Sequence, residues 1–355
     1  MYLRLLVCFL TSTFLSLVSY GAEFSSTGRL SNSQVVDDLV VGGLDEVCSA
    51  LGGLRLSLPC NPAFLGESTS NRFVANIYVA DDYERAQTYR RLLDEKREIE
   101  LLKDLFENDR SANFRGGVSL WYRGSNLAFS VTPYRLRVFS GIRNTVLPKM
   151  KIALFEEREF RAQYGTKLSK NLSIGVNSRL IDRKFIVEDL NLFSAIVDGD
   201  VVLQKNKQTA LIIEPGLVYQ FNETPWRPVL SAQMVGYSFV NRKYDSIETR
   251  PAVDFGLGIQ PLSNKFFFGA LSIGVNYRYR GFELEDKSPL SLGVLYQLGL
   301  IESFVRLSEE QLNFGVVSAI DKLRIGILMG QKLKTHSEFR EEDSNDIFLE
   351  LSYLL

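Results

Sequence analysis

The stretch "IFLELSYLL" (Ile347–Leu355) decides the class of fold. Alternate residues of it are apolar and share one face of a strand, at Ile347, Leu349, Leu351, Tyr353 and Leu355. Polar Glu350 and Ser352 fall on the other face, because side chains alternate along a strand. Chain ends usually fray, whereas the final strand of a closed membrane barrel must pair with the first. We therefore predict that Leu349, Leu351, Tyr353 and Leu355 belong to a barrel-closing strand.

The same two-residue period recurs through residues 71–355. It is clearest in "LSIGVNSRL" (Leu172–Leu180), "VDFGLGIQ" (Val253–Gln260), "FFGALSIGVNYRYR" (Phe267–Arg280) and "LRIGILMGQK" (Leu323–Lys332). The polar faces of these segments are rich in Gly, Ser, Asn and Arg, which suits a crowded polar lumen. The pattern predicts an all-β fold, a transmembrane antiparallel β-barrel of about 14 strands. A soluble exported β-protein, which also alternates, is the alternative.

The connections between the segments alternate in length. Short turns, such as 222–226, follow the even strands. Longer and more charged links mostly follow odd strands, as at 139–150, 182–208, 240–249 and 333–345. Barrels of the bacterial outer membrane have short periplasmic turns and longer external loops. We expect the short turns to face the periplasm.

Residues 1–21 have the pattern of a secretory signal peptide. Arg4 precedes an uncharged apolar run from Leu5 to Val18, and small Ser19 and Gly21 follow it. An anchor helix is the alternative, although the run is short for a membrane span. Export together with a barrel predicts the bacterial cell outer membrane as the location.

Residues 22–70 show no series of strands and are assigned to a periplasmic or plug segment. They are rich in Gly and end with Asn61, Pro62 and Ala63, a possible plug motif. A Gly-rich segment with Asn-Pro-Ala before the first strand resembles the FadL-like (long-chain fatty-acid transporter) superfamily of outer-membrane barrels, especially its TraF-like branch. The resemblance implies an N-terminal plug folded into the barrel. Cys48 and Cys60 could form a disulfide in the oxidising periplasm or remain two buried thiols.

A helix is expected at about residues 83–108, after the first strand. This segment lacks Gly and Pro and is dense in Glu, Arg, Lys and Leu. By strand parity it lies in the first external loop. It would cap the barrel mouth, fold into the mouth, or pack on the rim.

Charged residues at inward strand positions are the possible lumen-lining set. They are Glu157, Glu159, Arg161, Arg179, Glu214, Asp254, Arg278, Arg280, Arg324, Lys332 and Glu350. Such charges either form a field that selects solutes or pair with one another and fill the lumen.

No catalytic, cofactor-binding or metal-binding residue is predicted. The one histidine, His336, lies in a charged segment, and no phosphate loop or dinucleotide fingerprint occurs. With 41 basic and 42 acidic residues, nothing points to a nucleic-acid partner. Outer-membrane lipid and the barrel-assembly machinery are the expected partners, and a small or hydrophobic solute is a candidate third partner. The sequence thus predicts a channel or transporter and not an enzyme, and a barrel that anchors or assembles a surface or secretion apparatus is the alternative.

Overall fold

The computed structural model describes most of the strands and part of the N-terminal segment. The described residues are 39–52, 54, 57–67, 71–80, 90–93, 112–143, 149–191, 203–236, 238–241, 252–261, 269–279, 290–309, 311–333 and 346–354. The predicted signal peptide, residues 1–21, lies outside them, as does most of the predicted helix at about 83–108. No helix within the described ranges is both long and apolar enough to cross a membrane.

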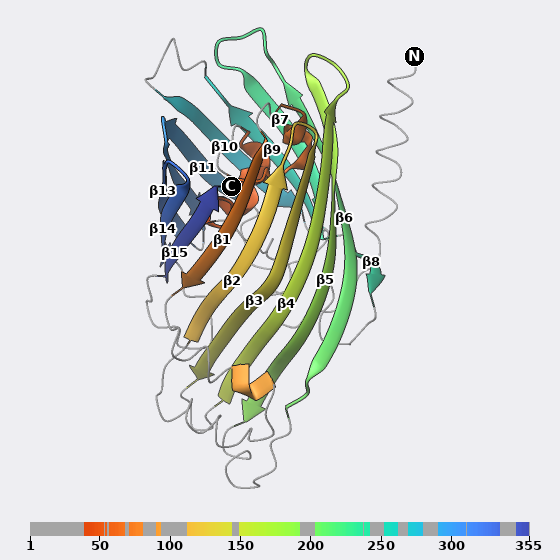
Figure 1. The fold of residues 1–355 in the computed structure, drawn as a ribbon, viewed down its shortest axis with the longest axis vertical. Coiled ribbons are helices and arrows are strands. Elements are labelled where there is room, and N and C mark those ends of the chain that lie inside the picture. Colours follow the sequence, from red (N-terminus) through yellow and green to blue (C-terminus); the bar gives the residue numbers. More distant parts are fainter. Residues whose placement is uncertain are drawn as a thin grey trace.

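Fifteen strand segments form one closed antiparallel sheet (Figure 1). They are β1 (Arg72–Ala80), β2 (Ala112–Arg123), β3 (Leu127–Arg143), β4 (Lys149–Lys167), β5 (Leu172–Asn191), β6 (Asn206–Gln220), β7 (Pro228–Val235), β8 (Ser238–Asn241), β9 (Ala252–Ile259), β10 (Ala270–Tyr279), β11 (Leu290–Leu298), β12 (Ile301–Ser308), β13 (Gln311–Ile320), β14 (Leu323–Lys332) and β15 (Asp346–Leu354). Segments β7 and β8 both pair with β6, one after the other, so 15 segments occupy 15 − 1 = 14 positions around the barrel. The predicted antiparallel barrel of about 14 strands is confirmed.

The last strand closes the barrel. Strand β15 pairs with β14 on one side and with β1 on the other, where Tyr353 lies opposite Ala75 and Leu349 opposite Val79. Its Leu349, Leu351 and Tyr353 are exposed, whereas Glu350 and Ser352 are buried. Leu355 lies outside the described residues. The period-two pattern of the final segment therefore arises because one face meets the barrel exterior and the other the lumen.

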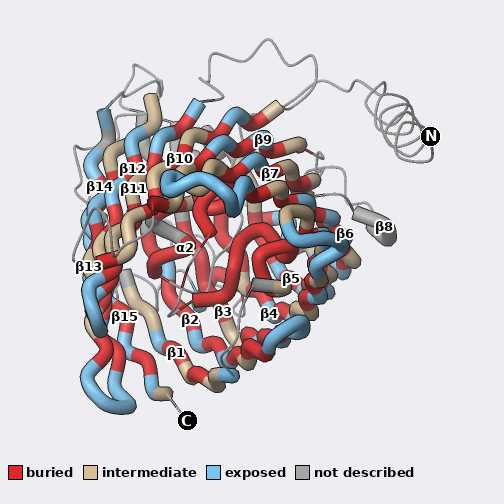
Figure 2. Tube along the Cα trace, turned by 90° about the horizontal axis from the view of Figure 1, so that it is seen from above, coloured by how far each residue is buried: buried red, intermediate tan, exposed pale blue. Residues whose placement is uncertain are grey.

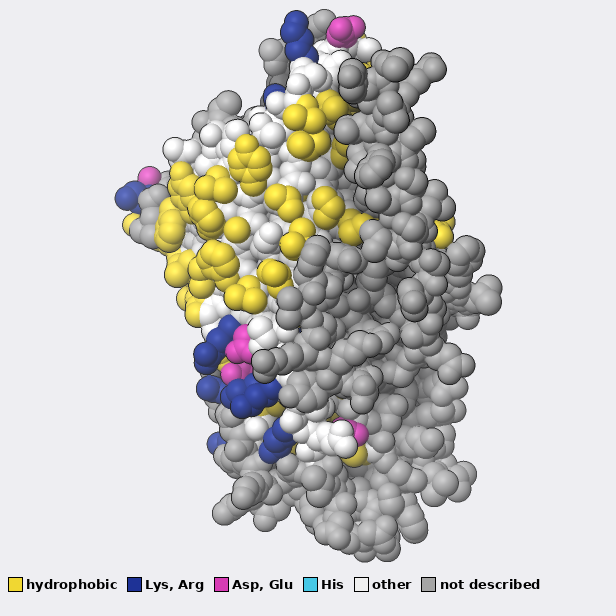
Figure 3. All heavy atoms as spheres, turned by 90° about the vertical axis from the view of Figure 1, so that its right-hand side faces the viewer, with side chains coloured by type: hydrophobic (Ala, Val, Ile, Leu, Met, Phe, Trp, Pro, Cys, Tyr) yellow, Lys and Arg dark blue, Asp and Glu magenta, His cyan; other side chains and the backbone are white. Residues whose placement is uncertain are grey.

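Apolar side chains cover a broad zone of the outer surface, which we call the apolar belt (Figure 3). Its exposed members come from strands all around the barrel and include Ile77, Leu120, Phe129, Phe160, Leu180, Leu217, Leu230, Leu257, Leu292, Val305, Ile325, Ile327, Leu349 and Leu351. Exposed aromatic residues lie near the short turns, at Tyr164, Phe221, Trp226 and Tyr353. A soluble protein rarely exposes so large an apolar surface. An outward apolar band with aromatic residues at its margin is the surface that a membrane-spanning barrel presents to lipid.

Strands β3 to β6 are longer than the sequence analysis expected. The predicted links 139–150 and 182–208 are in part strand, since β3 continues to Arg143 and β5 to Asn191. We call these four strands the tall wall (Figure 1). Their outward residues change from apolar to charged beyond Phe160, at Arg158, Asp182, Lys184 and Lys207. This charge made the ends of the tall wall resemble loops in the sequence, although β4 and β5 remain paired from Lys167 to Lys149 without a register shift.

The segment of the chain between 300 and 310 forms strand β12 of a hairpin. The turn at Gly299 and Leu300 joins β11 to β12, and β12 then pairs with β13. Gly299 has a φ of +58°, a left-handed conformation that favours glycine. Because β12 is only Ile301–Ser308, the alternation of apolar and polar residues there is short.

The described residues of the N-terminal segment lie inside the barrel. It contains helix α2 (Leu39–Leu44) and two 3₁₀-helices, η2 (Asp45–Ala50) and η3 (Pro62–Glu67). We call residues 39–67 the plug. It lies within the ring of strands (Figure 2), in the half of the barrel where the short turns lie (Figure 1). The plug therefore fills the lumen at one end, and the tall wall extends beyond it at the other.

The described part of the predicted loop helix, residues 90–93, lies against the outer face of the tall wall. Leu92 and Leu93 are buried in a cluster with Val138, Leu154 and Ile186. Those three residues are neighbours across β3, β4 and β5. On β4, the side chain of Leu154 is on the face opposite that of Gln163, and Gln163 contacts the plug. The cluster therefore lies on the outer face of the wall. The helix was expected to cap the barrel mouth, to fold into it or to pack on the rim. The position of residues 90–93 agrees with packing on the rim.

Candidate functional site: a plugged and charged lumen

The structure places most of the predicted lumen charges on the inner face of the wall. Eight of them are buried, namely Glu157, Glu159, Arg179, Glu214, Asp254, Arg278, Arg324 and Glu350. The Arg161 side chain is 12% exposed. Arg280 and the side chain of Lys332 lie outside the described residues. The period-two rule of strands positions each of these side chains towards the lumen.

Glu159 is the centre of an ion-pair cluster on the tall wall. Its Oε1 accepts hydrogen bonds from Arg179 Nε at 2.9 Å and from Arg161 Nη2 at 2.9 Å. Its Oε2 accepts from Arg135 Nη2 at 3.1 Å and Arg179 Nη2 at 3.1 Å. Three guanidiniums thus surround one carboxylate, and both of its oxygens are fully used.

Glu157 is a second centre, two residues along β4. Its Oε1 accepts a hydrogen bond from Arg137 Nη2 at 2.9 Å, and its Oε2 accepts from Arg135 Nη1 at 3.2 Å. Arg183 Nε lies 3.6 Å from Oε1. Arg137 also covers the ring of Phe155, with its guanidinium carbon 5.0 Å from the ring centroid. Arg135 therefore links the two centres.

Elsewhere on the wall, charges occur as separate pairs. Arg278 donates to both carboxylate oxygens of Asp254, at 2.6 and 2.7 Å. Arg324 Nη1 lies 2.8 Å from Glu350 Oε1, and the pair joins β14 to the closing strand β15. Buried ion pairs of this kind are costly to break, because the remaining charge is left without water.

The inward position of the β3 arginines does not follow from strict alternation, because a β-bulge reverses the parity. Thr132 faces the lumen, and strict alternation from it would put Tyr134 and Leu136 inward. The pairing of β3 with β4 shifts between Thr132 and Arg135, so Arg135 and Arg137 point inward instead. Pro133, which lacks a backbone N–H, lies in the bulge, where a proline is tolerated in a strand. Pro133 was therefore the feature of the sequence that could have indicated the bulge.

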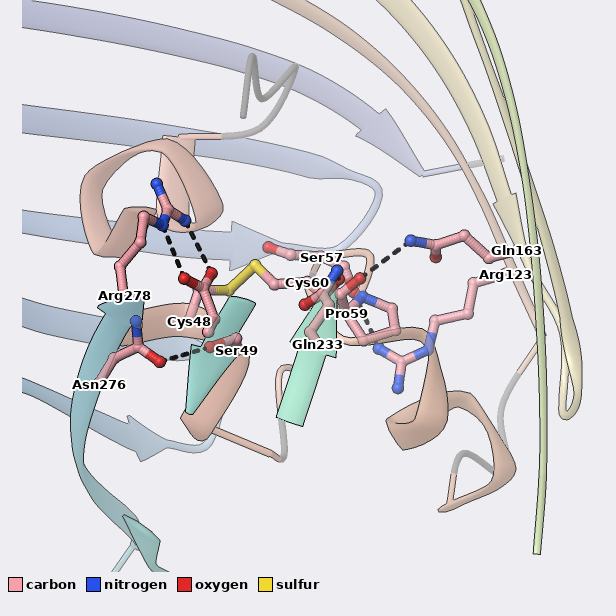
Figure 4. Close-up of a disulfide and its surroundings, with 11 residues drawn as sticks. Cys48, Ser49, Ser57, Pro59, Cys60, Arg123, Gln163, Gln233, Asn276 and Arg278 are labelled. Atoms are coloured by element: carbon pink, nitrogen blue, oxygen red, sulfur yellow. Dashed lines mark hydrogen bonds and ion pairs between the residues drawn. A yellow bond between two sulfur atoms is a disulfide. The ribbon is translucent and has the colours of Figure 1, made fainter. Parts of the chain in front are cut away.

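Cys48 and Cys60 form a disulfide within the plug, with 5.7 Å between their Cα atoms (Figure 4). The bond closes a ring of residues 48–60, which we call the disulfide ring. In the chain-entropy account, closing a loop of this length stabilises the folded state by about 3 kcal/mol. The ring ties η2 to the turn before η3.

Side chains from five different strands hold the disulfide ring, and Figure 4 shows those of Arg123, Gln163, Gln233 and Asn276. Three wall donors bind its backbone carbonyl oxygens. Arg123 of β2 donates to Leu54 O and Ser57 O, Gln163 of β4 to Pro59 O, and Gln233 of β7 to Cys60 O. Arg324 of β14 donates to Ser57 Oγ at 3.2 Å, and Ser49 Oγ donates to Asn276 of β10 at 3.0 Å. The ring is thus attached around the circumference by side chains, not by sheet pairing.

Asn61, Pro62 and Ala63 fit against a row of wall glycines. A Cβ on Gly175 would lie 2.5 Å from Pro62 C and 2.6 Å from Ala63 N, and Gly165 and Gly216 are equally close to the plug. Asn61 Nδ2 donates to Leu217 O and Ala232 O, both at 3.3 Å, and Asn61 Oδ1 accepts from Ala63 N at 3.0 Å. The three residues of the predicted motif therefore lie against the wall at positions where a side chain larger than that of glycine would collide with them.

The opposite side of the plug is apolar. Leu39, Val40, Leu44, Val47 and Leu51 pack with wall residues, among them Leu295, Phe304, Val317 and Leu328. The backbone N–H of Leu39 donates to Glu350 Oε2 at 2.6 Å. This side of the plug resembles the core of a folded domain, and it contacts the closing strand directly.

None of the described residues forms a group of three or more His, Cys, Asp or Glu side chains that could hold a metal ion. The chemistry of the lumen is that of arginine, carboxylate and amide groups. Such a lining binds and orders polar groups through charge and hydrogen bonding.

No protein-family model matches the chain, and no curated protein matches it. Among solved structures, it is similar to the toluene transporter TbuX of Ralstonia pickettii, at 11% identity over 83% of this chain and 92% of that chain, with a TM-score of 0.45. For the toluene transporter TodX of Pseudomonas putida the values are 11% identity, 94% and 98% coverage and a TM-score of 0.45. An outer membrane channel from Pseudomonas putida F1 shows 9% identity over 81% of this chain and 97% of that chain, with a TM-score of 0.36. None of the three concerns the TraF-like branch, which stays a prediction.

Proposed function

We propose that this protein is an outer-membrane channel or transporter for small or hydrophobic solutes, and that the plug closes its lumen. The apolar belt supports a position in a membrane, and the charged lumen supports a polar path through it. The barrel-assembly machinery and outer-membrane lipid are the partners that this location implies.

One observation carries the proposal. The plug is joined to the wall by side-chain hydrogen bonds, such as that of Gln233 to Cys60 O, and by close contact with Gly175. It shares no strand pairing with the barrel among the described residues. A segment held in this way can shift while the closed sheet stays intact, because its attachments do not include the ladder that holds the barrel together.

Conductance in planar lipid bilayers tests the proposal. We expect small, infrequent conductance from the purified wild-type protein and a clear increase from Gly175→Leu, whose side chain would displace Pro62 and Ala63. Val176→Leu is the matched control, since Val176 is adjacent on β5 and faces outward; it should behave as the wild type. Both variants must still migrate as compact barrels on gels when unboiled. A folded Gly175→Leu protein that conducts no better than the wild type would contradict the proposal.

The apolar side of the plug favours a second candidate, a barrel that anchors or assembles a surface or secretion apparatus. Val40, Leu44 and Val47 pack as in a permanent core, which suits a lumen that never opens. Conductance separates the two candidates. Loss of conductance in every plug variant, together with a partner that co-purifies in stoichiometric amount, would favour the anchoring role.

A further inference from the structure

One arginine of the tall wall is poorly satisfied by the carboxylate beside it. Glu157 faces three guanidiniums, and those of Arg135 and Arg137 lie within hydrogen-bond distance, at 3.2 and 2.9 Å. Arg183 Nε is 3.6 Å from the same carboxylate, too far for a hydrogen bond. The side chain of Arg183 is nevertheless only 2% exposed.

Arg183 occupies a lumen-facing position of β5, between the exposed residues Asp182 and Lys184. Its Nη1 is buried and has no hydrogen-bond partner among the described residues. A buried guanidinium without full compensation is costly, and a buried donor left unsatisfied adds to that cost. An acceptor from outside the described chain would remove both penalties.

The nearby carboxylates have no capacity left for Arg183. Glu159 accepts from three arginines. Glu214 Oε2 accepts from Asn177 Nδ2 at 2.6 Å, and Glu214 Oε1 accepts from the backbone N–H of Gly236 at 3.0 Å. These carboxylates therefore offer Arg183 no further oxygen, and the residue opposite it on β6 is the neutral Gln208.

The position of Arg183 suits a dissolved anion. It lies on β5 beyond Arg179, on the side away from the plug contact at Gly175. Its outward neighbours Asp182 and Lys184 are exposed and charged, so it lies at the level where the apolar belt has ended. Because Arg183 itself faces the lumen, a lipid headgroup on the outer face does not reach it.

We propose that Arg183, beside Arg137, binds a small oxyanion such as inorganic phosphate in the lumen of the tall wall. The planar guanidinium presents parallel N–H donors that match two oxygens of a tetrahedral oxyanion. The stacked rings of Phe155 and Phe185, with centroids 6.1 Å apart, are the next lumen-facing residues towards the long links. They lower the local dielectric, which strengthens the ionic contact. The site does not require that solutes pass through the barrel.

Calorimetric titration of the detergent-solubilised full chain with inorganic phosphate, in a buffer without other oxyanions, tests the site. We expect saturable binding by the wild type and a dissociation constant raised roughly tenfold or more in Arg183→Gln, which loses a charge-assisted hydrogen bond. Arg158→Gln is the matched control, because Arg158 is an exposed arginine on the outer face of β4. It should bind phosphate as the wild type does.

A second variant keeps the test decisive if Arg183→Gln does not fold. Arg183→Lys retains the charge but loses the planar donors, so it should fold and bind phosphate more weakly than the wild type. Wild-type protein that shows no saturable binding would overturn the proposal. So would equal affinity in Arg183→Lys, Arg183→Gln and the wild type. Because binding is measured without a membrane, a failure of conductance leaves this result unaffected.

Discussion

At the scale of single residues, Arg324 connects three parts of the molecule. It pairs with Glu350 on the closing strand at 2.8 Å and donates to Ser57 Oγ in the disulfide ring at 3.2 Å. Glu350 in turn accepts the backbone N–H of Leu39 at the start of α2. The side chains of Arg324 and Glu350 are both 0% exposed. One buried ion pair thus joins the seam of the barrel to the start of α2 and to the disulfide ring.

We expect Arg324→Met to destabilise the protein by about 3–5 kcal/mol, because it leaves the Glu350 carboxylate buried without its cation. The double variant Arg324→Met/Glu350→Met should recover much of that loss, since neither charge then remains. The measurement is the urea midpoint at which the compact band on unboiled gels is lost. A double variant less stable than the single one would show that the pair contributes more than the cost of an isolated charge.

At the scale of the element, the outward residues of each strand differ in their distance from the edge of the apolar belt. Outward Ile327 lies near the middle of β14 and is 43% exposed, whereas Ile320 is the last residue of β13, beside the turn at Asp321, and is 66% exposed. Both side chains point away from the lumen. They differ in their distance from the edge of the apolar belt.

An arginine should therefore be tolerated at position 320 and not at position 327. Ile327→Arg should cost about 2–4 kcal/mol, while Ile320→Arg should cost about 0–1 kcal/mol, because a cation near the interface keeps its hydration. Reversible urea unfolding in lipid vesicles measures both. Equal costs at the two positions would mean that this surface does not face lipid.

At the scale of the whole molecule, the barrel has two unlike ends. The plug and the short turns lie at one end, and the tall wall extends at the other (Figure 1). Along the tall wall, the apolar belt ends before the charged outward residues Arg158 and Lys184. We therefore expect the tall wall to project from the membrane at the end of the barrel away from the plug.

This asymmetry predicts the orientation in the cell. A peptide tag inserted in the link between β8 and β9 should be labelled on intact bacteria, because longer links face outward in outer-membrane barrels. A tag in the turn at 222–226, between β6 and β7, should be labelled only after the outer membrane is permeabilised. Labelling of the turn on intact cells, with the link protected, would reverse the orientation.

The sequence by itself determined the closed sheet. The alternation in "IFLELSYLL" and in Leu323–Lys332 reflects a choice between lipid and lumen at every residue, so the face of each side chain can be deduced without coordinates. The same rule placed Glu157, Glu159 and Arg179 on the inner face. Local periodicity is sufficient to assign each side chain to a face wherever a strand has two chemically different sides and no bulge.

Only the tertiary structure decided which groups meet. The bulge near Pro133 brought Arg135 and Arg137 into the lumen, because one extra residue reverses the parity of everything after it. The length of the tall wall depended on pairing between β4 and β5, which continues past the charged outward residues Arg158, Asp182 and Lys184. The disulfide ring is held by Arg123, Gln163 and Gln233 from strands far apart in sequence. Such contacts exist only when the barrel closes around the plug, and so a local pattern carries no record of them.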